Sequence, residues 1–182
     1  MDKKRPPIEL NAHWIKRDGL TVKELRRLLD SLMIVEMTCF PWKPDEYDHI
    51  KSYYLGMLVD PDNIMVILKY SEKMIGYAIA EPHNNEYCDE MLKADPKFRK
   101  IDNAYYIESV AVLPEYRHMG GFKKMTSLLY GDIRRHGGNM VTGHVRMIDG
   151  FDKVVAPYVK YQVDKWKFLH GKESMKYFEM PI

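Results

Sequence analysis

The residues best suited to hold a phosphate lie between a strand-like run and a helical run in the middle of the chain. Residues 108–125 read ESVAVLPEYRHMGGFKKM, in which a β-branched stretch stops at Pro114 and a helical pattern starts at the glycine pair 120–121. The first N–H groups of a helix have no partner within it and lie at the positive end of its dipole, so they form an anion site. Glycine also lets the main chain approach a ligand closely.

Cationic or potentially cationic side chains surround this junction. They are Arg117, His118, Lys123 and Lys124. Such groups donate charge-assisted hydrogen bonds to phosphate oxygens. An ordinary strand-loop-helix connection with solvated basic residues is the alternative interpretation. The step from Val112 through Pro114 to Arg117, directly upstream of the glycines, favours a phosphate loop.

Two helices are predicted upstream of the main sheet. The first starts at the capping box formed by Thr21 and Glu24, and its apolar residues recur at helical spacing until Pro41. The second helix is capped by Asp45 and stops before Pro61.

Continuous apolar runs predict the central strands. Residues 64–68 and 74–80 form a hairpin buried on both faces. A polar excursion over residues 81–103, with a short helix around 89–93, separates this hairpin from a strand at 105–113. Such an excursion often borders a site.

The C-terminal part is predicted to contain one more helix. Pro157 suits the first position of a helix that carries Tyr158, Tyr161 and Trp166. The other predicted elements are a short strand within residues 10–16, a helix over 120–136, and strands over 140–147, around Phe168 and over 175–180.

Composition predicts one folded domain over residues 1–182, with residues 1–9 as a loose N-terminal arm. The 182 residues are 46% hydrophobic and 12% aromatic, which excludes wholesale disorder. The net charge of +2 argues against a nucleic-acid partner. The sequence contains neither an apolar run long enough for a membrane span nor a secretion signal, and Cys39 and Cys88 lack metal-ligand spacing. We therefore expect a cytoplasmic protein without a metal.

The order of these elements resembles that of the GCN5-related N-acetyltransferase (GNAT) superfamily over nearly the whole chain. Family members carry an Arg/Gln-x-x-Gly-x-Gly/Ala loop between a central strand and a helix, preceded by a Val-x-Pro-like step. Arg117 and Gly120 fall in register with that loop, whereas Phe122 stands at its last position in place of glycine or alanine. The resemblance implies an α/β (α+β) fold with a mixed, mostly antiparallel sheet of six to seven strands and about four helices.

The resemblance also implies an acetyl-CoA site. The main chain of residues 118–122 would hold the pyrophosphate, and that of Val110 and Val112 would pair with the pantetheine arm. The full set of implied cofactor-binding residues is Val110, Ala111, Val112, Arg117, His118, Met119, Gly120, Gly121, Phe122 and Lys123.

Acyl transfer needs a neutral amine and a route for the proton that leaves it. Glu108 is the candidate base, because burial within a strand raises the pKa of a carboxyl group and family members often carry an acidic residue near this place. The alternative is a glutamate at a strand end that bonds the neighbouring backbone or faces solvent.

The leaving thiolate needs a proton donor, which in the family is commonly a tyrosine five residues before an aromatic residue. Tyr161 and Trp166 match that spacing, with Lys165 in place of the usual glycine. Tyr158 lies one helical turn away, so the assignment stays open between the two tyrosines. Either tyrosine could instead be a packing residue.

The resemblance implies transfer of an acetyl group from acetyl-CoA to a primary amine, directly within a ternary complex. A catalytically silent module that binds CoA or a protein partner is the alternative, because Phe122 and Lys165 depart from the family pattern. The acceptor, a small molecule or a protein, is not specified by the sequence, and a homodimer is left open.

Overall fold

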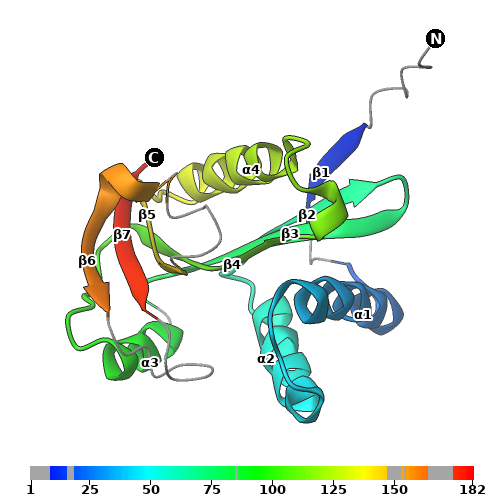
Figure 1. Ribbon diagram of the computed structural model, residues 1–182, viewed down its shortest axis with the longest axis horizontal. Helices are drawn as coiled ribbons and strands as arrows, with labels where there is room; N and C mark the ends of the chain where they lie inside the picture. Colours follow the sequence, from blue (N-terminus) through cyan, green and yellow to red (C-terminus); the bar gives the residue numbers. More distant parts are fainter. Residues whose placement is uncertain (1–8, 16–18, 85, 147–152, 154, 164–173) are drawn as a thin grey trace. The chain divides into compact units, whose positions relative to one another are not determined.

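The computed structural model describes residues 9–15, 19–84, 86–146, 153, 155–163 and 174–182 (Figure 1). In chain order the elements are β1 (Leu10–Trp14), α1 (Val22–Cys39), η1 (Pro44–Glu46), α2 (Tyr47–Val59), β2 (Ile64–Tyr70), β3 (Lys73–Pro82), α3 (Glu86–Ala94), β4 (Ala104–Val112), η2 (Pro114–Tyr116), α4 (Gly121–Arg135), β5 (Met140–Arg146), η3 (Ala156–Tyr158), β6 (Val159–Val163) and β7 (Met175–Pro181), where η marks a short 3₁₀-helix.

The described strands hydrogen-bond in the order β1-β2-β3-β4-β5-β7-β6, which makes a seven-stranded sheet. β1 pairs antiparallel with β2, and β7 pairs antiparallel with both β5 and β6. β4 and β5 run parallel, paired from Ala104 opposite Met140 to Tyr106 opposite Thr142. The predicted mixed, mostly antiparallel sheet with about four helices is therefore confirmed.

The chain forms two compact units. The first contains residues 1–79 and 109–131, and the second contains residues 80–108 and 132–182. The boundary falls within β3, β4 and α4, so each of these elements contributes to both units. The expectation of one domain over residues 1–182 stays a prediction.

In the first unit, α1 and α2 lie on one face of the strands and the start of α4 lies on the other (Figure 1). The capping box that begins α1 is present: the Glu24 carboxylate accepts from the Thr21 N–H at 2.8 Å, and the Thr21 hydroxyl accepts from the Glu24 N–H. The apolar stripe of this helix buries Leu32 and Met33 fully. The capping box and the spacing of the apolar residues therefore both favour this helix.

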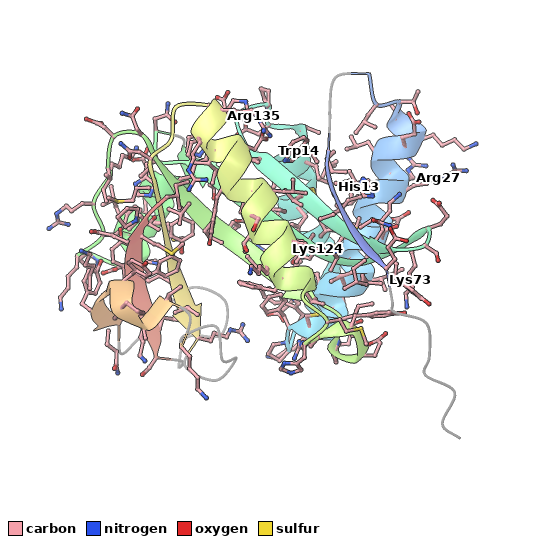
Figure 2. All side chains as sticks on the ribbon, turned by 90° about the horizontal axis from the view of Figure 1, so that it is seen from above. His13, Trp14, Arg27, Lys73, Lys124 and Arg135 are labelled. Atoms are coloured by element: carbon pink, nitrogen blue, oxygen red, sulfur yellow. The ribbon has the colours of Figure 1, made fainter. Side chains whose placement is uncertain are left out.

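Two side chains tie the edge strand β1 to α4, and both of them, Trp14 and Lys124, are labelled in Figure 2. The Lys124 ammonium donates to the Leu10 carbonyl at 2.8 Å, and the Trp14 indole N–H donates to the Leu128 carbonyl at 3.4 Å. Edge strands carry unpaired backbone groups. These bonds satisfy one such group and fix the start of α4.

The second unit is built around an aromatic core. Met91 and Phe98, from the polar excursion between β3 and β4, pack with Tyr106 and Tyr177. The short helix predicted around residues 89–93 is confirmed as α3. The excursion therefore contributes to the core of its unit as well as to its surface.

Two local predictions are wrong. Asp45 does not cap the second helix; it lies within η1, and α2 follows with Glu46 at its N-cap and no side-chain cap. Pro157 starts no long helix among the described residues, because η3 ends at Tyr158 and Tyr161 lies in strand β6. Trp166 and the strand predicted around Phe168 lie outside the described residues.

Candidate functional site

The loop between β4 and α4 has a main-chain conformation suited to an anion. His118 and Gly120 both lie in the left-handed region, with φ of 64° and 79°. Residues 117–120 are exposed, and the Lys124 N–H donates to the Gly120 carbonyl at 3.2 Å as the helix begins. Left-handed residues are a component of the main-chain turns in which N–H groups gather around an anion. This loop is the candidate binding site of the first unit.

The two glycines of the loop serve different purposes. A Cβ on Gly121 would lie 2.4 Å from Cδ2 of Leu68 and 3.2 Å from Cδ1 of Leu10, so glycine is needed there for helix-to-strand packing. A Cβ on Gly120 would meet nothing within 4 Å. Gly120 therefore leaves open space beside the loop and is needed for its left-handed conformation.

The base of the loop is held by the carbonyl of Val112. This oxygen accepts from Nε of Arg117 at 3.0 Å and from the thiol of Cys39 at 3.4 Å. Burial raises the pKa of the Cys39 thiol, although Arg117 acts in the opposite direction. Arg117, predicted as a phosphate donor, thus uses one of its N–H groups to fix the loop itself.

The other predicted loop residues differ in their exposure to solvent. Met119 and Lys123 are exposed, and Phe122 is half-buried. The ammonium of Lys124 is bound to the Leu10 carbonyl, so this lysine holds β1.

β4 shows an alternating pattern after Ile107. Glu108, Val110 and Val112 are half-buried, whereas Ser109 and Ala111 are buried. Glu108, the candidate base, belongs to the second unit, and Val110 to Val112 belong to the first. Oε2 of Glu108 is buried, so the carboxylate is partly removed from water, and its role as the base stays a prediction.

Tyr161 belongs to a buried polar network in the second unit. Its hydroxyl donates to Oδ2 of Asp95 at 2.8 Å, and Nε2 of His144 lies 3.1 Å from the same oxygen. Nδ1 of His144 lies 2.9 Å from the hydroxyl of Tyr106. The side chains of His144 and Asp95 are 0% and 3% exposed.

The pKa values of this network keep Asp95 ionised and its partners neutral. Burial opposes ionisation of Asp95, but hydrogen bonds from His144 and Tyr161 outweigh it and lower its pKa. Burial lowers the pKa of His144 although Asp95 acts against it, and burial together with Asp95 raises the pKa of Tyr161. Neutral His144 then directs its single ring hydrogen, on Nε2, to Asp95, and its Nδ1 accepts from Tyr106.

Tyr158 lies in η3 and is 37% exposed. With Tyr161 and Glu108 it belongs to the second unit, whereas the loop residues 117–123 belong to the first.

Asp95 was not predicted from the sequence. Its only sequence signal is its place before Pro96 at the end of the predicted short helix.

Comparison with known proteins gives a family and a fold. The model of the acetyltransferase (GNAT) family matches residues 25–147. Comparison with curated proteins found no match. No helix within the described ranges is both long and apolar enough to cross a membrane.

Solved structures share the fold at low sequence identity. The ribosomal-protein-S18-alanine N-acetyltransferase from Escherichia coli aligns with a TM-score of 0.65 at 13% identity, covering 96% of this chain and 94% of its own. Aminoglycoside 6′-acetyltransferase type Ii aligns at 0.64 and 13%, covering 94% and 96%. The PaiA N-acetyltransferase from Thermoplasma acidophilum, in complex with coenzyme A, aligns at 0.58 and 12%, covering 96% and 99%.

Proposed function

The chain belongs to the GNAT acetyltransferase family, and from this premise we propose that it transfers an acetyl group from acetyl-CoA to a primary amine. The observation that carries the proposal is the loop of residues 117–121, with two left-handed residues and open space beside Gly120. One structural neighbour holds coenzyme A. These features support CoA thioesters as the acyl donor.

The loop would bind the donor mainly through its main chain. The N–H groups at the start of α4, together with those of residues 118–120, suit the pyrophosphate. Phe122 stands where the family motif has glycine or alanine. It is compatible with pyrophosphate binding, because the hydrogen-bond donors are backbone N–H groups and its side chain is half-buried. The exposed ammonium of Lys123 adds a positive charge, whose attraction for the phosphates is screened by salt.

Glu108 is the proposed base. In the reaction a bond forms between the amine nitrogen and the acetyl carbon, the carbon-sulfur bond breaks, and the nitrogen loses a proton. A half-buried carboxylate on β4 suits removal of that proton. Direct transfer in a ternary complex requires no acyl-enzyme.

The proton for the leaving thiolate is proposed to come from Tyr158 or Tyr161, and the contacts favour Tyr158. The hydroxyl hydrogen of Tyr161 is engaged by Asp95, and burial with that carboxylate raises its pKa, which makes Tyr161 a weaker acid. Tyr158, by contrast, is exposed to solvent.

The acceptor class is a primary amine on a small molecule or a protein. The neighbours named above act on a ribosomal protein alanine and on aminoglycosides, which illustrates the range of amines this fold serves. The cytoplasm is the proposed location, consistent with Cys39 being a free thiol.

The test is acetyl transfer measured as release of CoA thiol, with a panel containing polyamines, aminoglycosides, lysine peptides and peptides with free N-termini. We expect one class to be acetylated, and Glu108→Gln to lower kcat at least about 100-fold with little change in acetyl-CoA affinity. Asp89→Asn, at an exposed carboxylate of α3, is the matched control and should retain activity.

A second candidate function is a CoA-binding module without turnover. The bond from Tyr161 to Asp95 favours it, because a tyrosine committed to a buried carboxylate is suited to a structural role. Acetyl-CoA binding without transfer to any amine of the panel would support this module, and transfer abolished by Glu108→Gln would exclude it.

A further inference from the structure

The first unit contains a buried carboxylate that the proposed reaction does not use. Glu36 of α1 is 1% exposed. Its Oε1 accepts from the indole N–H of Trp42 at 2.7 Å, and its Oε2 accepts from the hydroxyl of Tyr77. A buried carboxylate is costly unless donors satisfy it. These two donors explain how Glu36 is accommodated inside the unit.

Tyr77 of β3 is the centre of this network. Its hydroxyl lies 3.1 Å from the hydroxyl of Tyr54 and 3.0 Å from Oγ of Ser109, and the residue is fully buried. A phenol has one hydrogen, and that hydrogen goes to Glu36. Tyr54 and Ser109 must therefore donate to Tyr77. Glu36 thus sets the direction of the hydrogen bonds that join Tyr77 to Tyr54 and Ser109.

The same face of α1 reaches β4 at a second point. Cys39 lies three residues after Glu36, which places both on one side of the helix. The Cys39 thiol donates to the carbonyl of Val112, while Glu36 acts through Tyr77 on Ser109. α1 therefore holds β4 at both ends of residues 109–112.

β3 packs closely against the end of this segment, at Ala111 and Val112. A Cβ on Gly76, beside Tyr77, would lie 2.7 Å from the carbonyl oxygen of Ala111 and 3.3 Å from Cγ2 of Val112. The Leu113 N–H donates to the Ile75 carbonyl at 2.8 Å. The main chain of residues 109–112 is thus fixed from one side by β3 and at both ends by α1.

We propose that Tyr77, held by Glu36, is a positioning residue for β4, the strand whose main chain is proposed to bind the acyl donor. It fixes Ser109 and hence the main chain of residues 109–112. This inference rests on the proposed function, in which that main chain pairs with the pantetheine arm. The hydroxyl of Tyr77 serves donor binding without touching the donor. A cluster that only stabilised the fold would leave donor affinity of the folded protein unchanged.

Tyr77→Phe tests the inference, since it removes the hydroxyl and keeps the ring. Tyr54→Phe is the matched control: it deletes a hydroxyl from the same cluster but leaves Tyr77 bound to both Glu36 and Ser109. For each folded variant the Kd of CoA is measured by calorimetry, and KM for acetyl-CoA and kcat are measured separately. We expect Kd and KM to rise about tenfold in Tyr77→Phe, with kcat changed less, and to change less than about twofold in Tyr54→Phe.

Ser109→Ala completes the design. It should weaken CoA binding like Tyr77→Phe, and the double variant should bind no more weakly than either single one, because both remove the same link. Equal Kd values in wild type, Tyr77→Phe and Tyr54→Phe, or losses of affinity that add in the double variant, would overturn the inference.

Amide hydrogen exchange supplies a readout that does not depend on ligand. Tyr77→Phe should speed exchange at residues 109–112 more than in β1 of the same unit, and Tyr54→Phe should not. If wild-type protein binds no CoA, the proposed function fails and exchange alone decides the positioning role. Unchanged exchange at residues 109–112 in Tyr77→Phe contradicts it.

Discussion

The hydroxyl of Tyr161 donates to Oδ2 of Asp95 at 2.8 Å, although 66 residues separate the two in the chain. The same carboxylate oxygen lies 3.1 Å from Nε2 of His144. Asp95 therefore joins the excursion between β3 and β4 to strands β5 and β6 within the second unit. A tyrosine that the family pattern marks as an acid is, in this chain, a hydrogen-bond donor to a buried carboxylate.

Replacing Asp95 with asparagine should destabilise the protein by about 1–3 kcal/mol, because the carboxylate accepts from His144, Tyr161 and the Lys97 N–H, and an amide weakens or loses at least one of these hydrogen bonds. The measurement is urea unfolding at neutral pH. Asp89→Asn is the control: Asp89 pairs with Lys100 at 2.8 Å on the surface, and its loss should cost at most about 1 kcal/mol. Equal losses in the two variants would contradict a stabilising role for Asp95.

His83 should make stability fall in mild acid. Burial lowers its pKa from 6.5 to about 4, with Lys100 acting in the same direction. Between these pH values the unfolded chain binds a proton that folded His83 does not, so stability is complete above pH 6.5 and decreases toward pH 4. The difference corresponds to about 3 kcal/mol at most.

The check is urea unfolding of wild type and His83→Gln across this pH range. The variant should have a shallower slope but not a flat one, because His144 also has a lowered pKa. In the wild-type protein, Nδ1 of His83 accepts from the Ile101 N–H and Nε2 lies 2.7 Å from the Thr142 hydroxyl. Parallel pH profiles for the two proteins would show that His83 does not cause the effect.

The neighbouring lysines of α4 should have different roles. Lys124→Met removes the bond to the Leu10 carbonyl and should lower stability by about 1 kcal/mol. Lys123→Met should leave stability nearly unchanged and weaken acetyl-CoA binding, with a smaller deficit at high salt. Thermal unfolding and calorimetric titration at two salt concentrations separate the two effects. A stability loss confined to Lys123→Met would contradict these assignments.

The two glycines at the start of α4 should also differ. Gly121→Ala places a methyl group against buried Leu68 and should cost about 1–3 kcal/mol of stability. Gly120→Ala meets no neighbour and should cost about 1 kcal/mol, because its φ of 79° disfavours side chains. Chemical denaturation of both variants measures the difference. A larger loss for Gly120→Ala would show that packing at Gly121 is less tight.

Features encoded locally were predictable from the sequence. Thr21 and Glu24 mark the start of α1 by chemistry that spans only four residues, and the glycine pair at 120–121 marks the start of α4. Up to β5, the order of strands and long helices followed from apolar runs. These signals act within one turn or one strand, so tertiary context does not override them.

Features decided by distant partners were not predictable. Pro157 suits a helix start, but the chain continues as β6, in which Tyr161 stacks on Tyr177 of β7 with ring centroids 4.9 Å apart. Pairing with β7 outweighs the local helical spacing. Asp45 failed as a cap because Pro44 and Asp45 form a separate 3₁₀ turn first.

The candidate site follows the same division. A loop before a helix start at the glycine pair 120–121 was predicted from the sequence, whereas the partners of Glu36 and Asp95 come from several elements at once. Hydrogen-bond partners separated by tens of residues leave no spacing pattern in a single sequence. The loop was therefore foreseen and the supporting networks were not.

Calorimetric titration of the protein with acetyl-CoA tests the central claim most directly. Wild type is compared with Gly120→Glu, which puts a negative charge where the pyrophosphate is proposed to bind, and with Gly131→Glu, which puts the same charge about 16 Å further along α4 at a site with room for a side chain. The account predicts saturable binding to wild type and Gly131→Glu, and loss of binding in Gly120→Glu. Equal affinity in all three folded proteins, or no binding to wild type, would contradict it.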